Sequence, residues 1–158
     1  KTVGLQHLAK ENPYDLELSE RKLVAIASVL AMNTKVLILD EPTAGLDPAG
    51  RDEILGLVSK MHRELGITIL LVSHSMEDVA EYVDRIIVMN HGAVMFDALP
   101  KQVFAHYKEL EAVGLAAPQV TYLVHELAER GLPVDTQATT AKEAAQTILS
   151  ALREKNVI

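Results

Sequence analysis

Cysteine and tryptophan are absent from the 158 residues of this sequence. Without thiols the chain can form no disulfide bond and carry no thiolate chemistry, which permits a reducing compartment. No apolar run approaches the roughly 18 residues of a membrane-spanning segment, and the N-terminal residues lack the apolar core of a signal peptide. These absences predict a cytoplasmic chain and leave open a peripheral contact with a membrane through a partner.

Positive charge is scarce relative to negative charge. The chain has 15 lysines and arginines against 22 aspartates and glutamates, for a formal net charge of -7. Because general nucleic-acid binders normally present a basic surface, we expect no nucleic-acid partner. Apolar residues make up 49% of the chain, which is enough to fold around a core. The length suits one domain with or without a small appendage.

Four short segments have the aliphatic composition of β-strands, namely residues 35–39, 67–73, 85–90 and 93–97. The first two are almost continuously aliphatic, which is typical of parallel strands covered on both faces. A helical pattern between them ends at Gly66, a residue suited to a left-handed helix end. Strand, helix and strand in this order predict a βαβ unit and an α/β fold. His91 and Gly92 predict a hairpin between the last two strands.

Helical patterns flank these strands. An apolar stripe predicts a helix over about residues 19–32, and the segment after the last strand shows helical patterns only. Thr140 and Glu143 have the spacing of a capping box at the start of the final helix. We therefore expect two domains, residues 1–99 with the strands and residues 100–158 as a helical extension.

Two acids, Asp40 and Glu41, directly follow the first strand. Open α/β sheets bind ligands at the carboxyl ends of their strands, where one acid can hold Mg²⁺ while the next orients or deprotonates a water for phosphoryl transfer. His74 follows the second strand, so parallel pairing would bring it close to Glu41, where an imidazole can hold a phosphate or the attacking water. Acids after a strand also start turns, and a lone histidine there is more often structural. Asp47, directly before Pro48, suits an N-cap, a functional loop residue, or both.

In this order and spacing, four segments resemble motifs of the ATP-binding cassette (ABC) ATPases. "KVLILDE" is similar to their Walker B strand with the catalytic glutamate, "AGLD" to their D-loop, and "LVSHSME" to the segment with their switch histidine. "LSERKLVAIASVLAM" stands where their signature motif and its helix belong. The resemblance covers roughly residues 12–97 and implies part of a P-loop NTPase with a parallel sheet core, followed by a helical C-terminal extension.

A finer resemblance, in "NPYDLELS" and in the tail "VGLAAPQVTYLVHELAERGLPV", is to the ATPase subunits of energy-coupling factor (ECF) importers. It implies that Glu41 activates water and that Asp40 positions Mg²⁺. His74 would hold the γ-phosphate of ATP, and Asp47 would bridge an ATPase dimer. The tail would contribute to dimerisation, or serve as a helical cap on the domain's own core. The implied partners are a second ATPase subunit, a transmembrane coupling protein and a membrane component that binds a vitamin or metal ion, at the cytoplasmic face of the membrane.

Two departures from the family pattern bear on activity. The sequence has no G-x-x-x-x-G-K-[ST] loop to cradle phosphates, so we expect a part of a longer protein that does not bind ATP tightly by itself and exposes apolar surface. The signature reads LSERK instead of leucine, serine, two glycines and glutamine. Ser19 can still donate its hydroxyl to ATP of the opposite subunit, or act as an N-cap, but Glu20 adds negative charge near that phosphate. We therefore predict an asymmetric heterodimer in which the site completed by this signature is weak or non-hydrolytic.

Two other functions stay open at this point. A non-catalytic module that kept the signature helix and the tail would act only in dimerisation and interaction. A soluble ABC-type ATPase of another branch would act on DNA or the ribosome, which the acidic charge and the ECF-like tail disfavour.

Overall fold

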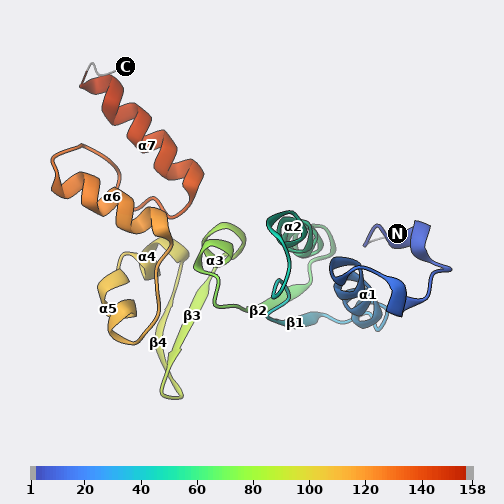
Figure 1. The fold of residues 1–158 in the computed structure, drawn as a ribbon. Coiled ribbons are helices and arrows are strands. Elements are labelled where there is room, and N and C mark those ends of the chain that lie inside the picture. Colours follow the sequence, from blue (N-terminus) through green and yellow to red (C-terminus); the bar gives the residue numbers. More distant parts are fainter. Residues whose placement is uncertain (1–2, 156–158) are drawn as a thin grey trace. The chain divides into compact units, whose positions relative to one another are not determined.

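The computed structural model describes residues 3–155. The chain forms two compact units that divide between His74 and Ser75. Both units contain helices and strands (Figure 1), which confirms the predicted α/β class. The predicted division into the domains 1–99 and 100–158 stays a prediction. Within the described part of the chain, no helix has both the length and the apolarity to span a bilayer.

The first unit is a two-stranded parallel sheet with two long helices. In chain order its elements are the short 3₁₀ helices η1 (Leu5–Leu8) and η2 (Pro13–Asp15), then α1 (Leu18–Leu30), β1 (Val36–Asp40), α2 (Pro48–Leu65) and β2 (Thr68–Val72). β1 and β2 pair in register, from Val36 with Thr68 to Asp40 with Val72. The strands therefore end at the same edge, and the predicted βαβ unit is confirmed.

Local signals define the ends of α2. Asp47 caps the first turn, since its Oδ1 accepts a hydrogen bond from the Gly50 N–H at 2.9 Å, and Pro48 occupies the first helical position. Gly66 ends the helix with a left-handed φ of 64°. Both ends follow the sequence predictions.

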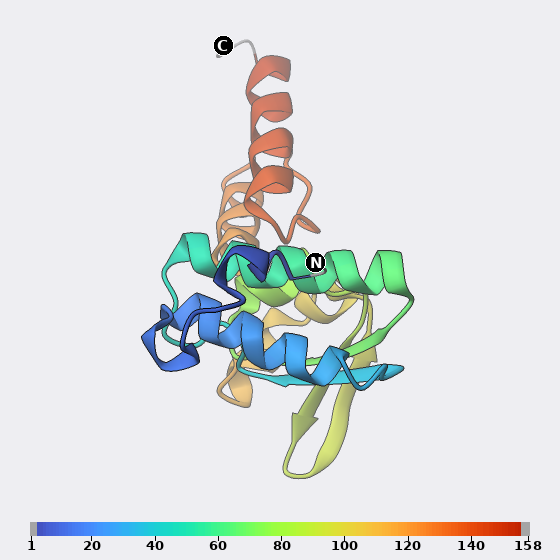
Figure 2. The ribbon, with the colours of Figure 1, turned by 90° about the vertical axis from the view of Figure 1, so that its right-hand side faces the viewer.

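The two faces of the β1–β2 sheet differ. α1 and α2 lie on the same side of the sheet (Figure 2), and the alternate residues Leu37 and Leu39 are buried on that side. They form a core with Leu23, Ile26, Ile54, Val58, Met61 and Ile67. On the opposite face Ile38 is 64% exposed and Leu70 is 48% exposed. The expectation that both faces are covered is wrong for the described residues because both helices pack on one side, whereas the expected exposed apolar surface is present.

The second unit combines a β-hairpin with helices. Its elements are α3 (Met76–Tyr82), β3 (Ile86–Asn90), β4 (Ala93–Ala98), α4 (Pro100–Phe104), α5 (Tyr107–Ala112), α6 (Gln119–Glu129) and α7 (Ala141–Glu154). β3 and β4 pair antiparallel, joined by His91 with φ of 47° and Gly92 with φ of 79°. Positive φ at both central positions is what a two-residue type I′ hairpin turn requires. The predicted hairpin is confirmed.

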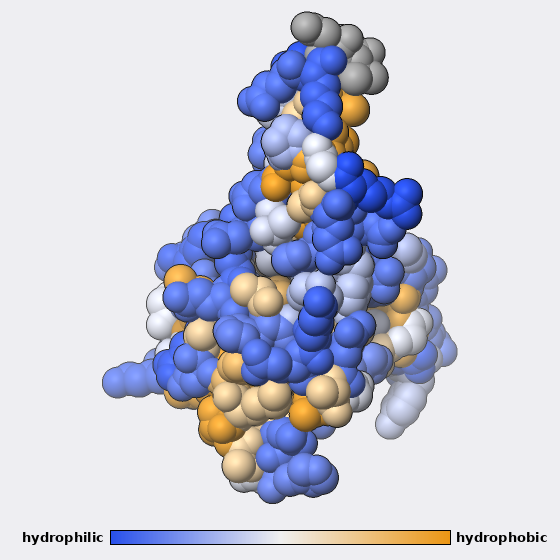
Figure 3. Space-filling model, turned by 90° about the vertical axis from the view of Figure 1, so that its left-hand side faces the viewer, coloured by the Kyte–Doolittle hydropathy of each residue, from blue (hydrophilic) through white to orange (hydrophobic). Residues whose placement is uncertain are grey.

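One face of this hairpin packs on helices. Phe104, Leu110 and Val88 belong to the core of this unit. The helical pattern that starts at residue 100 is interrupted between α4 and α5, where the His106 ring stacks on the Phe96 ring with centroids 5.0 Å apart. Figure 3 shows hydrophobic surface beside hydrophilic surface along α7.

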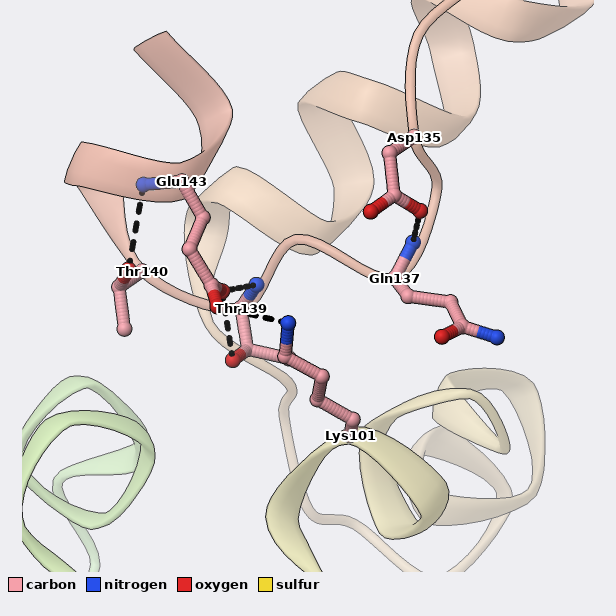
Figure 4. Close-up of polar contacts among 6 residues, drawn as sticks. All are labelled: Lys101, Asp135, Gln137, Thr139, Thr140 and Glu143. Carbon is pink, nitrogen blue, oxygen red and sulfur yellow. Dashed lines mark hydrogen bonds and ion pairs between the residues drawn. The ribbon is translucent and has the colours of Figure 1, made fainter. Parts of the chain in front are cut away.

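A polar cluster links α4 to the start of α7 (Figure 4). Lys101 Nζ lies 2.7 Å from Glu143 Oε1, and Glu143 Oε2 accepts a hydrogen bond from the Thr139 N–H at 3.0 Å. Thr140 is the N-cap, as predicted, because its Oγ1 accepts from the Glu143 N–H at 3.3 Å. Burial raises the pKa of Glu143, but the hydrogen bonds and the charge of Lys101 together hold that pKa below its ordinary value.

Candidate active site at the carboxyl ends of β1 and β2

The backbone turns sharply where β1 ends. The Glu41 N–H donates to the Val72 carbonyl at 2.9 Å, which continues the strand pairing one residue beyond Asp40. Glu41 then adopts a φ of 46°, in the left-handed region that costs a residue with a Cβ about 1–3 kcal/mol. The Ala44 N–H donates to the Glu41 carbonyl at 3.1 Å and closes the turn. Strained backbone of this kind clusters at functional sites, because surrounding contacts must hold it.

The structure brings Glu41 and His74 together. His74 Nδ1 lies 2.7 Å from Glu41 Oε1. Because an ionised carboxylate only accepts hydrogen bonds, Nδ1–H is the donor, and Nε2 remains for another partner. The side chain of His74 is 84% exposed and that of Glu41 is 31% exposed, so a ligand can reach the imidazole. The predicted proximity of these two side chains is confirmed.

Asp40 suits a site for Mg²⁺. It is exposed, and because side chains alternate along a strand it shares the open face of the sheet with Ile38. Mg²⁺ binds proteins through one or two carboxylates, with water and phosphate oxygens completing its octahedron. Residues 3–155 contain no group of three or more His, Cys, Asp or Glu side chains that could hold a metal ion by themselves. Asp40 therefore fits an ion whose other ligands come from a phosphate compound and from water.

Asp47 and Ser19 belong to a second group, at the first turns of α2 and α1. Gly50 allows these turns to approach each other: a Cβ at Gly50 would lie 3.0 Å from Asp47 Oδ1 and 3.7 Å from the Ser19 Cβ. The capping role of Asp47 is confirmed, and its role in a dimer stays a prediction. Four of the five predicted site residues thus fall into two groups, Glu41 with His74 and Asp47 with Ser19, while Asp40 ends β1 directly before Glu41.

Ser19 lies inside α1 rather than at its cap. The N-cap position is Glu17 and the helix begins at Leu18, so the interpretation of Ser19 as an N-cap is wrong. Glu20 provides the physical reason. Its Oε2 accepts a hydrogen bond from the Glu17 N–H at 2.9 Å, so the helix is capped at Glu17, ahead of Ser19. The other interpretation of Ser19, a hydroxyl that donates to ATP of the opposite subunit, stays a prediction; the structure places this residue in the first turn of α1.

Lys22 makes a contact that sequence patterns did not predict. Its Nζ donates to the carbonyl of Pro42 at 2.8 Å, in a partly buried setting. α1 is thereby tied to the residue that directly follows Glu41. The two partners are 20 residues apart and share no periodic pattern, so no local signal in the sequence marks the contact.

Solved structures with this fold are ATP-binding cassettes. One is cbiO1 from Clostridium perfringens, part of the ABC transporter complex cbiONQ, with a TM-score of 0.64 and 44% identity, covering 78% of this chain and 49% of that chain. Another is the ADP conformation of MJ1267, an ATP-binding cassette of an ABC transporter, with a TM-score of 0.64 and 30% identity, covering 70% of this chain and 44% of that chain. A family model described as an AAA domain, putative AbiEii toxin, type IV toxin–antitoxin system, matches residues 16–78. The fold places the chain in the class of ATP-binding cassettes.

Curated relatives of higher sequence identity indicate one family within this class. The energy-coupling factor transporter ATP-binding protein EcfA2 of Clostridium perfringens is 49% identical over 156 residues, which cover 98% of this chain and 55% of the relative. The EcfA2 protein of Clostridium tetani is 50% identical over 155 residues, covering 97% of this chain and 54% of the relative. The chain spans about half the length of the curated relatives it matches. It belongs to the family of ECF transporter ATP-binding proteins.

Proposed function

We propose that the protein is an ATP-binding and ATP-hydrolysing subunit of an ECF-type ABC importer, which couples hydrolysis of Mg-ATP to uptake of a vitamin or a metal ion. The observation that carries the proposal is the hydrogen bond of 2.7 Å between Glu41 and His74, at the carboxyl ends of two parallel strands. The relatives, which are named as ATP-binding proteins of energy-coupling factor transporters, support this reaction class.

Three residues have separate roles in the proposed hydrolysis of ATP. Glu41 accepts a proton from the attacking water as the general base. His74 donates through Nδ1 to Glu41, and in its protonated form Nε2 also donates and can hold an oxygen of the terminal phosphate. Asp40 provides a carboxylate for Mg²⁺, which when bound neutralises charge on the phosphates.

The second group of residues supports a dimeric arrangement. Ser19, in the first turn of α1, would donate to ATP held by the opposite subunit, and the exposed Asp47 would contact that subunit. Glu20 stands beside Ser19 with a carboxylate already used for its own helix, which favours a weak site at this signature. We infer an asymmetric heterodimer with a second ABC ATPase.

The family also supports partners in the membrane. We infer that the ATPase pair binds an ECF transmembrane coupling protein and a membrane component that binds the substrate, so the protein would sit peripherally at the cytoplasmic face of the membrane. In support, the similar cbiO1 is described as part of the transporter complex cbiONQ. The net charge of -7 agrees with the absence of a nucleic-acid partner.

A non-catalytic module for dimerisation is the second candidate. One observation favours it: the 158 residues contain no G-x-x-x-x-G-K-[ST] loop, so the phosphate cradle is not among them. The two candidates differ in their need for Glu41, because a dimerisation module would work without a general base.

ATP turnover by the full-length protein, co-expressed with its neighbouring ATPase, tests the proposal. Glu41→Gln keeps the shape of the side chain and removes the base, so kcat should fall about 100-fold or more while ATP binding persists. Glu64→Gln makes the matched change at an exposed position of α2 and should leave kcat unchanged. Wild-type turnover in Glu41→Gln would refute the role of Glu41 and favour the dimerisation module.

A further inference from the structure

The turn that carries Glu41 is held by contacts from outside its own segment. Glu41 has a φ of 46° and directly precedes Pro42, whose ring restricts the conformation of the preceding residue. Pro42 has its own φ fixed near −65° by the ring. The remaining soft torsion of Pro42 decides where its carbonyl points, and that carbonyl accepts the hydrogen bond from Lys22 Nζ at 2.8 Å.

The hydrogen bond from Lys22 is suited to stabilising the strained backbone at Glu41 and Pro42. A hydrogen bond from an ammonium group is stronger than one between neutral groups, and this one lies in a partly buried setting on a buried proline. Removal of the donor would leave the Pro42 carbonyl without that bond and release the torsion that follows the strained Glu41. The direction of the Glu41 side chain, and with it the bond to His74, depends on this backbone.

α1 also contacts the far end of the same segment. A Cβ at Gly45 would lie 3.4 Å from Leu18 Cδ2, and one at Gly50 would lie 3.7 Å from the Ser19 Cβ. Ser19 and Lys22 are three residues apart, and so on neighbouring positions of one helix face. The first five residues of α1 therefore contact both ends of the segment from Pro42 to Gly50.

We propose that Lys22 is a positioning residue for Glu41, and that it makes the activity of Glu41 depend on the position of the N-terminal part of α1. The inference rests on the proposed function and adds regulation to it. A shift of α1, such as one caused by a phosphate ligand at Ser19, moves the Pro42 carbonyl and redirects the Glu41 carboxylate toward or away from His74.

Substitutions of Lys22 in the full-length protein, co-expressed with the neighbouring ATPase, test this inference. Lys22→Met keeps the length of the side chain and removes the donor, so kcat for ATP should fall roughly 10- to 100-fold, with KM changed less than about twofold. Lys22→Arg keeps a charged donor and should recover most of the loss. Lys60→Met, at an exposed lysine of α2, is the matched control and should behave as wild type. If Lys22→Met does not fold, Lys22→Leu, which also lacks a donor, replaces it.

Two further readouts separate positioning from a general structural role. In a Glu41→Gln background, Lys22→Met should cause no further loss of turnover, because Lys22 acts through Glu41. Amide hydrogen exchange of Ala44, whose N–H bonds to the Glu41 carbonyl, should accelerate about tenfold in Lys22→Met and not in Lys60→Met.

The outcomes distinguish this inference from the proposed function. If Glu41→Gln keeps wild-type turnover while Lys22→Met still accelerates exchange at Ala44, the proposed function fails and Lys22 still positions the turn. Lys22→Met that matches Lys60→Met in turnover and in exchange overturns the positioning role. A loss of the same factor in the wild-type and Glu41→Gln backgrounds overturns it as well.

Discussion

The two units of the chain use charged side chains in opposite ways. In the first unit, Glu41 and His74 meet at an open sheet edge, with a strained backbone and a histidine that is 84% exposed. In the second unit, Glu143 directs its carboxylate inward to Lys101 and to the buried Thr139. An exposed pair contributes little to stability and can meet a ligand, whereas a satisfied cluster holds helices together. The difference supports the proposal of chemistry at the first unit's sheet edge, and it indicates a stabilising role for the cluster in the second unit.

The largest effect on stability is expected at the core of the second unit. Phe104 is 1% exposed, so Phe104→Ala removes a fully buried ring and should lower the free energy of unfolding by about 3–5 kcal/mol. Chemical denaturation followed by circular dichroism measures the change. The exposed Leu99→Ala is the control and should cost far less; an equal cost at both positions would contradict the assignment of Phe104 to the core.

Glu143 should give the second unit a dependence on pH. Its pKa is lowered from an ordinary value of 4.5, so its stabilising contribution is present above the unfolded-state pKa and is lost as pH falls through the folded-state pKa. Glu143→Gln should cost roughly 1 kcal/mol at pH 7, a modest figure because the Lys101 pair is partly exposed. Thermal unfolding at pH 7 and at pH 3 should show a smaller acid-induced loss in the variant than in wild type.

The matched control for that experiment is Glu129→Gln, at an exposed position of α6. It should keep the acid response of the wild type. ATP turnover per folded molecule should be the same in Glu143→Gln as in wild type, because the cluster serves stability. A loss of turnover without a loss of stability in Glu143→Gln would break the comparison between the units.

Thr121 offers a gain in stability. Its side chain is 1% exposed, and its Oγ1 has no hydrogen-bond partner among the described residues. Thr121→Val replaces the hydroxyl by a methyl group of similar shape and should stabilise the protein by about 1 kcal/mol. Thr121→Ser keeps the hydroxyl, deletes the methyl group, and should destabilise by about 1 kcal/mol. Denaturant midpoints of both variants check the opposite signs.

The smallest effect is expected at the hairpin turn. His91, like Glu41, has a positive φ, but it stands in a turn where asparagine before glycine is the preferred sequence. His91→Asn should therefore raise the free energy of unfolding by about 0.5 kcal/mol and leave turnover unchanged. A melting curve and an ATPase assay on the same sample test both parts. Altered turnover would show that the strained position in the second unit also serves catalysis.

Local sequence signals predicted the features that depend on neighbouring residues, such as helix ends and turns. Gly66 and the Asp47–Pro48 step marked the ends of α2, and His91 with Gly92 marked the hairpin, because each depends on backbone preferences of adjacent residues. The pairing of Glu41 with His74 was predictable since parallel strands align their ends.

Contacts between distant residues were not predictable in the same way. The bond from Lys22 to Pro42 joins residues that are 20 positions apart on different elements. The cap at Glu17 is a local feature, since Glu20 bonds the Glu17 backbone from three residues away, but serine is the more common cap residue and therefore misled the prediction. The aliphatic strands also predicted a sheet that is covered on both faces, whereas one face is exposed. The composition of a strand shows that it can be buried, but it does not show how many helices are available to cover it.

A double-mutant cycle of Glu41→Gln and His74→Ala, read by ATP turnover in the full-length protein with its partner ATPase, tests the central claim most directly. The claim is that the two side chains act as one unit on the terminal phosphate and its attacking water. It predicts that each single variant loses about 100-fold or more in kcat and that the double variant loses at most about threefold beyond the worse single variant. Losses that multiply in the double variant would contradict the claim.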